Sequence, residues 1–315
     1  MSADPLPPVT LAIEWANARD TAPGCVGRQM EALQSELQRC EGRFSEQPVV
    51  LYLHAGDCEA EIRRELASHG TKLADLAELR IVAIAGADYL GLKRAGVGLA
   101  RTGITLFSDC DVEPQKGWLT ELLAPFADPD VVAAAGFTHI AVDGMLSKVC
   151  ALAWVYHLPS EADLPLRRNR VYANNFAVRS EYFRAHPWLA PAGGKKGGTP
   201  FLREVERNGK RWARVTRARM LHPPHRSAWR FVQRGWEAGH DQDWVARQKG
   251  DSTRLGRVKE AFHHFKVNAR RVLPRLVTKR RDVSLPLWQV PAALCLALAH
   301  WTATLVAELS RAVRR

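Results

Sequence analysis

The sequence predicts an α/β protein in which a mostly parallel sheet, flanked by helices, is followed by a basic, apolar helical tail. Strand-favouring apolar runs alternate with stretches of helical periodicity as far as residue 111. Strands that are separated by helices pair in parallel, and the helices then cover both faces of the sheet. Near the C-terminus, residues 285–306 include no formally charged side chain, and Lys and Arg flank them on both sides.

Three strands and three helices are predicted before the central strand. The strands are expected at Val9–Trp15, Pro48–His54 and Leu79–Ile84. The second of these runs is almost continuously apolar, which is typical of a strand buried on both faces. Helical spacing of apolar residues is found at Val26–Leu37, Glu59–Ser68 and Leu90–Ala100.

The central strand, Gly103–Asp109, leads into an acidic elbow formed by Asp109, Cys110 and Asp111. Side chains two residues apart in an extended chain point to the same side, so both carboxylates are expected to face one spot at the carboxyl end of the strand. Open α/β sheets bind ligands at that edge. The two carboxylates repel each other unless a cation lies between them, and Mg²⁺ or Mn²⁺ bound to substrate phosphates suits such a pair. Cys110 is expected to point into the core.

The residues after the elbow distinguish it from a chance acidic triplet in a solvated turn, which is the competing interpretation. Pro114 is suited to the start of a helix. An apolar stripe with helical spacing follows: Trp118, Leu119, Leu122, Leu123 and Phe126. A strand, an acidic elbow and an amphipathic helix in this order favour a metal and phosphate site.

Beyond residue 130 the pattern is less regular. We expect strands at Val131–Gly136, Val171–Val178 and Arg211–Leu221, helices at Phe201–Arg207 and Ala228–Ala238, an irregular region at 138–169, and a flexible basic loop at Gly193–Gly198. Residues 250–283 are basic and are expected to be helical in pieces. The sheet domain is predicted to occupy residues 1–248, and the tail residues 249–315.

Composition limits the classes of partner. The chain of 315 residues carries 45 Lys and Arg against 33 Asp and Glu, a formal net charge of +12. Such a charge favours a polyanionic partner, namely a nucleotide, a nucleic acid or an anionic membrane. The basic residues lie mostly beside the apolar tail and no nucleic-acid-binding motif is recognised, so we do not expect a nucleic acid. Six scattered cysteines fit a reducing compartment, and the first twenty residues resemble no secretory signal.

The apolar segment 285–306 is long enough to span a hydrocarbon core. Its basic flanks favour association with the cytoplasmic face of a membrane. A terminal helix packed on the domain or on a second copy of the chain is the competing interpretation. The sequence leaves open whether the segment spans the membrane or lies on it.

The run Tyr89–Leu119 resembles the centre of family 2 glycosyltransferases, in which a glycine-containing helix leads to a strand, an aspartate motif, a proline and Gly-Trp-Leu. The outer segments Val9–Asn17, Asn174–Arg179 and Arg217–His222 are similar to other motifs of that family, so the resemblance covers about residues 9–245. It implies a GT-A fold, which is Rossmann-like. It also implies a hexosyltransferase-like enzyme that transfers a sugar, with inversion, from a nucleotide-sugar to a glycan or lipid-linked acceptor of the cell envelope.

The resemblance also implies roles for the acidic elbow. Asp109 would contact the ribose or the metal, and Asp111 would bind a divalent cation, Mg²⁺ or Mn²⁺, on the diphosphate. His222 would be a late metal ligand, although a histidine after a strand is also a common structural residue.

Three further residues are implied to bind the nucleotide-sugar. Glu14 follows the first strand, where the family contacts the nucleotide. Asp57, near the end of the second strand, would contact the base, with His54 as a rival. Lys93 would meet a phosphate, unless it only forms part of a solvated helix face.

The catalytic base is where the chain departs from the family. The usual acidic pair would fall near residue 198, where the sequence reads Gly198-Thr-Pro200. Glu204 is the candidate base, with Glu113 and Asp143 as alternatives. The missing pair also motivates a second hypothesis, a catalytically inactive GT-A protein that binds a sugar or nucleotide or serves as a scaffold. A nucleotidyltransferase is less favoured because residues 16–27 lack its Gly-rich, Arg-containing loop.

Overall fold

The computed structural model describes residues 5–162, 171–188, 198–248 and 253–314. The chain divides into two compact units. The sheet unit comprises Met1–His139, Ala162–Leu189 and Gly197–Pro223. The helical unit comprises Ile140–Glu161, Ala190–Lys196 and Pro224–Arg315.

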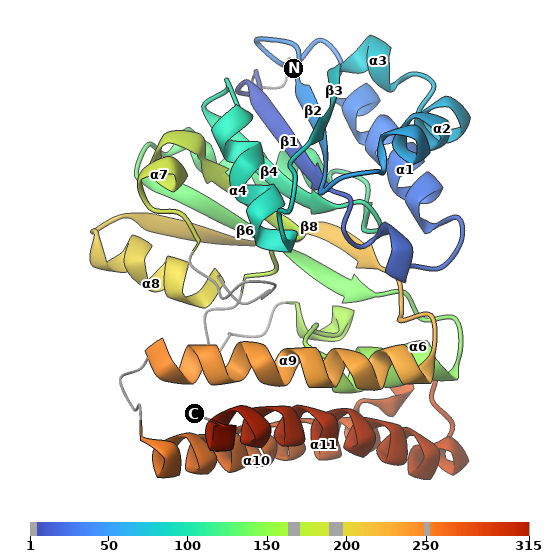
Figure 1. The fold of residues 1–315 in the computed structure, drawn as a ribbon. Coiled ribbons are helices and arrows are strands. Elements are labelled where there is room, and N and C mark those ends of the chain that lie inside the picture. Colours follow the sequence, from blue (N-terminus) through green and yellow to red (C-terminus); the bar gives the residue numbers. More distant parts are fainter. Residues whose placement is uncertain (1–4, 163–170, 189–197, 249–252, 315) are drawn as a thin grey trace. The chain divides into compact units, whose positions relative to one another are not determined.

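An eight-stranded sheet with the order β3-β2-β1-β4-β7-β6-β8-β5 forms the centre of the sheet unit (Figure 1). Its strands are β1 (Val9–Glu14), β2 (Val49–His54), β3 (Glu78–Ala83), β4 (Ile104–Asp109), β5 (Glu113–Pro114), β6 (Val131–Ile140), β7 (Asn175–Arg179) and β8 (Arg211–His222). Pairing is parallel from β3 to β4. It is antiparallel where β7 joins β4 and β6, and where β5 joins β8. The predicted parallel pairing is thus confirmed for the first half of the sheet.

Helices cover both faces of the sheet. They are α1 (Cys25–Arg39), α2 (Glu59–His69), α3 (Leu73–Leu76), α4 (Tyr89–Leu99), α5 (Trp118–Leu123), α7 (Ser180–Ala185) and α8 (Gly198–Arg207). α1, α2 and α3 lie on one side of the sheet, and α4 and α7 on the other (Figure 1). The first side buries a mainly aliphatic core, to which the aromatic residues Trp15, Tyr52 and Trp118 are added. The other buries a cluster of rings from Phe107, Phe176, Phe183, Trp188 and Phe201.

Local chemistry fixes α4, which matters for the site. The Asp88 side chain caps the helix by accepting a hydrogen bond of 2.7 Å from the Gly91 amide. Gly96 faces β1 so closely that a Cβ added there would lie 2.7 Å from the Ala12 Cβ. The helix therefore lies directly on β1, next to the end of β4.

Several predicted boundaries differ from those of the structure. Strand β7 begins only at Asn175, because a turn with a hydrogen bond from the Asn175 amide to the Tyr172 carbonyl precedes it. α8 begins at Gly198, three residues earlier than predicted. Most of the predicted basic loop at Gly193–Gly198 lies outside the described residues. The predicted strand Arg211–Leu221 is confirmed and extends to His222.

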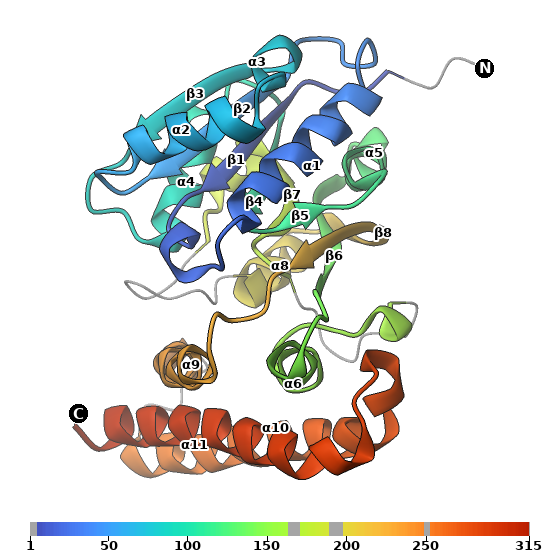
Figure 2. The ribbon, with the colours of Figure 1, turned by 90° about the vertical axis from the view of Figure 1, so that its right-hand side faces the viewer.

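The helical unit contains α6 (Met145–Ala153), α9 (Ala228–Gln248), α10 (Arg254–Thr278) and α11 (Val290–Arg314). α6 and α9 lie in one layer, and α10 and α11 in the next (Figure 2). The helical pieces predicted at 250–283 are α10, which continues through Pro274, and a 3-10 helix at Arg280–Val283. α9 packs against α10 and α11. The predicted domain boundary between residues 248 and 249 stays a prediction.

Candidate metal and nucleotide site

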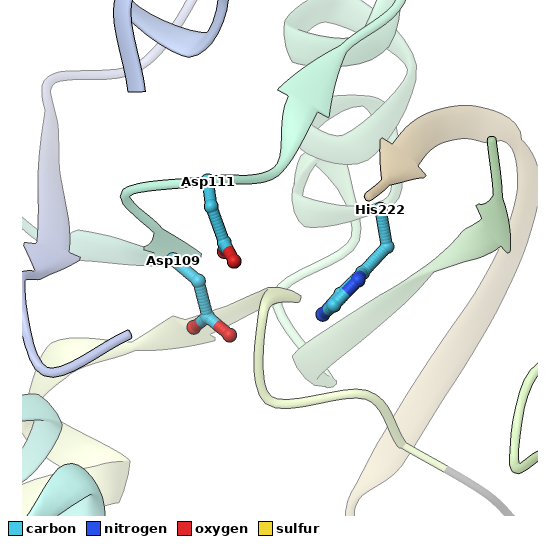
Figure 3. Close-up of side chains that lie close together, drawn as sticks. All are labelled: Asp109, Asp111 and His222. Carbon is cyan, nitrogen blue, oxygen red and sulfur yellow. The ribbon is translucent and has the colours of Figure 1, made fainter. Parts of the chain in front are cut away.

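The acidic elbow and the end of β8 bring three possible metal ligands together. The ligand atoms of Asp109, Asp111 and His222 all lie within 4.8 Å of one another (Figure 3). Both aspartates are almost fully buried. β4 and β8 are not neighbours in the sheet, but β5 follows the elbow directly and pairs with the end of β8. The short antiparallel pairing of β5 with β8 places His222 beside the elbow.

The Asp109 and Asp111 carboxylates converge with the His222 imidazole, as predicted (Figure 3). Strand alternation is not the reason, because β4 ends at Asp109 and Asp111 lies in the turn that follows. Cys110, between them, is fully buried in the apolar core as predicted. Burial, and then the charges of Asp111, Glu14 and Asp109, raise the pKa of the Cys110 thiol well above its usual value. The thiol therefore stays neutral and acts as a packing residue.

His222 is held by a hydrogen bond of 2.6 Å between its Nδ1 and the Pro223 carbonyl oxygen. A carbonyl can only accept, so Nδ1 carries the proton and Nε2 carries the lone pair of the neutral ring. A hydrogen bond of this kind is the usual way in which proteins orient a metal-binding histidine.

Asp109 is held from two sides. Its Oδ1 lies 2.7 Å from the Nζ atom of Lys93 and accepts a hydrogen bond of 3.0 Å from the Tyr89 hydroxyl. Its Oδ2 accepts one of 3.0 Å from the Asn17 amide. Tyr89 and Lys93 are four residues apart on α4, so they share one helix face. Lys93 is completely buried, which rules out the solvated helix face considered from sequence.

Glu14 joins this network through Asn17. The Glu14 carboxylate, at the end of β1, accepts hydrogen bonds of 2.7 Å from the Ala16 amide and 2.8 Å from the Asn17 side chain. Asn17 thus links Glu14 to Asp109. The ends of β1 and β4 are neighbours in the sheet, so this link runs along the edge where α/β sheets bind ligands.

Carboxylates gather at this edge of the sheet. Glu14, Asp109 and Asp111 are all buried there, and the buried ammonium of Lys93 pairs with Asp109 at 2.7 Å. Carboxylate oxygens are the ligands that Mg²⁺ and Mn²⁺ prefer, so this edge suits a divalent cation.

The ligand spacing also fits such an ion. Two ligands at about 2.1 Å from a cation are at most about 4.2 Å apart. The observed limit of 4.8 Å therefore requires only a small rotation of one side chain. We conclude that the residues fit a divalent cation held by Asp111 and His222, with Asp109 beside it.

The turn after the elbow is fixed by a residue that the sequence analysis missed. Glu36 of α1 is buried and accepts hydrogen bonds from the backbone amides of Gly117 (3.0 Å) and Leu119 (3.1 Å). It thereby caps the first turn of α5. The Trp118 indole donates to the Asn175 side chain at 2.9 Å, which ties the same turn to β7.

Asp57 lies on the surface. It forms an ion pair of 2.9 Å with Arg19, and the two side chains are 86% and 69% exposed. A hydrogen bond from its own backbone, and then the charge of Arg19, lower the pKa of Asp57. The structure does not place Asp57 in the Asp109 network, whereas its rival His54 is buried at the end of β2. Contact of either residue with a nucleotide base stays a prediction.

The structure does not bring the candidate base to the elbow. The described side-chain contact of Glu204 is with His186, at 2.9 Å. Glu113 pairs with Arg28 at 2.6 Å, and Asp143 belongs to the helical unit. The identity of a catalytic base therefore stays a prediction.

Two contacts of Asp109 went unrecognised in the sequence. Tyr89 precedes Lys93 by four residues, and Asn17 follows Glu14 by three. Helical spacing could have pointed to Tyr89 once Lys93 was a candidate. No comparable signal marks Asn17, because its contact depends on how the loop after β1 turns.

No protein-family model and no curated protein matches the chain. Among solved structures, it is similar to GalNAc-T7 with UDP, GalNAc and Mn²⁺, with a TM-score of 0.50 and 13% identity over 70% of this chain. The chain covers 44% of that protein. It is also similar to the mannosyltransferase PcManGT from Pyrobaculum calidifontis in complex with GDP-Man and Mn²⁺, with a TM-score of 0.48 and 16% identity over 98% of this chain and 78% of that one. At such identities the likeness concerns the fold, and the predicted GT-A fold is confirmed.

Proposed function

We propose that this chain is a metal-dependent, inverting glycosyltransferase of family 2 that uses a nucleotide-sugar donor. The observation that carries the proposal is the cluster of Asp109, Asp111 and His222 at the carboxyl edge of a GT-A sheet. Its carboxylate and imidazole donors suit a divalent cation, either Mg²⁺ or Mn²⁺. The solved structures with similar folds contain Mn²⁺ with UDP or GDP-Man, which agrees with such a donor.

The cation, when bound, would neutralise the charge that develops on the leaving nucleoside diphosphate. Asp111 and His222 would hold it. Asp109 would be fixed in place by Lys93, Tyr89 and Asn17, so that its carboxylate need not reorganise when the donor binds. Glu14, at the neighbouring strand end, would contact the nucleotide.

An inverting transfer also needs a base that takes the proton of the acceptor hydroxyl. We propose Glu204 for this role, by resemblance, and a glycan or lipid-linked acceptor of the cell envelope. The contact of 2.9 Å between Glu204 Oε1 and His186 Nδ1 competes with that role, because this oxygen would have to leave His186 to accept the proton.

This pair favours a second candidate function, a GT-A protein that binds a nucleotide-sugar without transferring it. Both functions share the donor and the metal. They differ in turnover, which the test below measures separately.

The test is a thermal-shift panel of UDP, GDP, CDP and dTDP and their sugars, with and without Mn²⁺ or Mg²⁺. A ligand at a hundred times its dissociation constant adds about 2.7 kcal/mol to the free energy of unfolding. We expect metal-dependent stabilisation by one nucleotide class in the wild type and none in Asp111→Asn. No stabilisation of the folded wild type by any donor would overturn both functions.

The donor so identified would then be incubated with the protein and candidate acceptors. Release of nucleoside diphosphate, with inversion at the anomeric carbon seen by NMR, supports the transferase. Binding without release supports the second function.

A further inference from the structure

The two tail helices turn polar side chains inward and expose apolar ones. On α10, the residues Arg257, His264, Arg271 and Arg275 are spaced by seven, seven and four positions, so they form one stripe. This stripe points into the helical unit. Leu255, Phe262, Leu273 and Val277 lie on the opposite side and are all exposed. Lys259 and Lys266 are exposed on that same side. A helix in contact with water normally turns its apolar residues inward.

Each member of the polar stripe on α10 is bonded inside the unit. Arg257 donates to the Ala312 carbonyl at the end of α11 (3.0 Å), and Arg271 to the Trp154 carbonyl after α6 (3.0 Å). These cations therefore cap the negative ends of two other helices. Arg275 pairs with Glu161 at 3.0 Å, and His264 with Glu308 of α11 at 2.8 Å.

α11 is reversed in the same way. His300, Thr304 and Glu308 are its buried polar residues. The exposed side chains on the described part of α11 are Pro291, Ala292, Cys295, Leu298, Ala299, Thr302, Val306 and Val313. None of these carries a charge, so an uncharged surface runs along the whole helix. Just before α11, Trp288 is 77% exposed.

The apolar stripes of α10 and α11, with Trp288, form a surface that we call the outer face. Among the exposed residues of α10 and α11 that the structure describes, the charged ones are Arg254, Lys259, Lys266 and Arg270. Lys259 and Lys266 lie between the apolar residues of α10, so the outer face is apolar with cations interspersed. A monomer in water seldom exposes so many apolar residues on one face without a partner. Apolar side chains with a tryptophan and cations are typical of helices that lie in a membrane interface.

We propose that the outer face binds an anionic lipid bilayer, with α10 and α11 lying in the plane of the interface. Charge complementarity selects this partner. A second copy of the chain would bring the same cations against each other and would be repelled.

A membrane-spanning α11 does not fit the helical unit, although the stretch Leu287–Val313 is long and apolar enough to cross a membrane by length and composition. His300 and Thr304 are bonded to the Phe231 and Gly235 carbonyls of α9, at 2.7 and 2.9 Å. A Cβ at Gly235 would lie 2.2 Å from the His300 carbonyl oxygen, so the two helices pack so closely that a side chain at position 235 would clash. Spanning would break these contacts and expose Glu308 to lipid.

The experiment is cosedimentation of the full chain with phosphatidylcholine vesicles, with and without a third of phosphatidylglycerol. We expect binding to the anionic vesicles, at least tenfold stronger than to the neutral ones. Raising the salt from about 0.1 M to about 1 M shortens the Debye length from about 10 Å to about 3 Å, so it should weaken the binding. Alkaline carbonate should release the protein, because no helix spans the bilayer.

The variant Phe262→Glu/Val306→Glu places two acids on the outer face at exposed positions. It should keep the wild-type circular dichroism and melting temperature and lose at least tenfold in vesicle binding. Leu99→Glu is the matched control, since Leu99 is an exposed apolar residue at the end of α4 in the sheet unit. It should bind vesicles like the wild type.

Three results would overturn the proposal. One is equal binding of the folded double variant and the wild type. Another is wild-type protein that resists carbonate extraction, which would indicate a spanning helix. The third is a wild type that does not bind vesicles but dimerises in solution, while the double variant stays monomeric. That result would assign the outer face to a second copy. None of these results depends on the proposed transferase activity.

Discussion

The two units use their acids differently. In the helical unit, Glu161 and Glu308 join separate segments, since Glu161 pairs with Arg275 and Glu308 lies 2.8 Å from His264, both on α10. In the sheet unit, Asp109 and Asp111 converge with His222 at one edge of the sheet. Acids spread over helix contacts hold a fold together, whereas acids that converge with a histidine suit a cation. The comparison therefore separates structural polar residues from those of a binding site.

The strongest way to sharpen this comparison is Lys93→Met, which removes the ammonium that pairs with Asp109. Lys93 and Asp109 are 0% and 4% exposed, so removal of the ammonium leaves a buried carboxylate unpaired. We expect a loss of roughly 3–5 kcal/mol in the free energy of unfolding, measured by denaturant titration. Mn²⁺ should restore more stability in this variant than it adds to the wild type.

Lys116→Met is the matched control, because Lys116 is exposed. It should change the stability by no more than about 0.5 kcal/mol. Equal effects of the two substitutions would show that the Lys93–Asp109 pair is not structural.

Asp111→Asn removes one charge and one metal ligand from the elbow while it keeps the shape of the side chain. If the proposed activity holds, the transfer rate should fall about a hundredfold, which corresponds to about 2.7 kcal/mol. The apparent Mn²⁺ requirement should rise in the same assay. If the variant keeps the wild-type rate and Mn²⁺ requirement, Asp111 is not a metal ligand.

Glu161→Gln breaks a balanced pair in the helical unit. Its side chain and that of Arg275 are 13% and 10% exposed, so both retain more contact with water than Lys93 and Asp109 do. We therefore expect a smaller loss at pH 7, about 2 kcal/mol, measured by denaturant titration. Nucleotide and metal binding should not change, and a loss of Mn²⁺ binding would contradict the division of roles between the two units.

The same residue gives a pH dependence. Burial opposes ionisation of Glu161, but hydrogen bonds from His157 and the Leu158 amide and the charge of Arg275 lower its pKa to about 2. The folded pKa is depressed, so this stabilisation is present above the unfolded pKa of about 4.3. It is lost as the pH falls from there toward 2. The Glu161→Gln variant should show a shallower decline over this range in melting experiments.

Asp57→Asn should have the smallest effect. Its exposed ion pair with Arg19 contributes little, so the free energy of unfolding should not change measurably. If Asp57 contacts the nucleotide base, as the resemblance predicts, donor affinity should fall about tenfold, or about 1.4 kcal/mol. Calorimetric titration of the donor measures this, and unchanged affinity would assign that role to another residue.

The sequence predicted the meeting of Asp109, Asp111 and His222 better than the contacts that hold Asp109. The two aspartates stay together because they flank the turn at the end of β4, and the end of β8 places His222. The partners of Asp109 depend instead on how closely α4 approaches β1 and on the loop that carries Asn17. Neither follows from periodicity.

The tail likewise has side-chain contacts that its sequence did not predict. The uncharged run 285–306 predicted an apolar helix, and α11 is one. The sequence could not show that His264 and Arg275 of α10 are paired inside the unit, because these contacts join residues more than forty positions apart. Inverted amphipathicity becomes visible only when those partners are known. The base is a third case, since Glu204 had no motif to identify it.

The central claim is that the acidic elbow is a divalent-cation site, and Mn²⁺ titration followed by electron paramagnetic resonance tests it directly. We expect the wild type to remove the signal of free Mn²⁺ with one ion per chain, and more tightly when the correct nucleoside diphosphate is present. Asp111→Asn and His222→Ala should each bind at least tenfold more weakly, while Asp57→Asn should bind the ion like the wild type. Equal binding by the wild type and by the Asp111→Asn and His222→Ala variants, with or without nucleotide, would contradict the account.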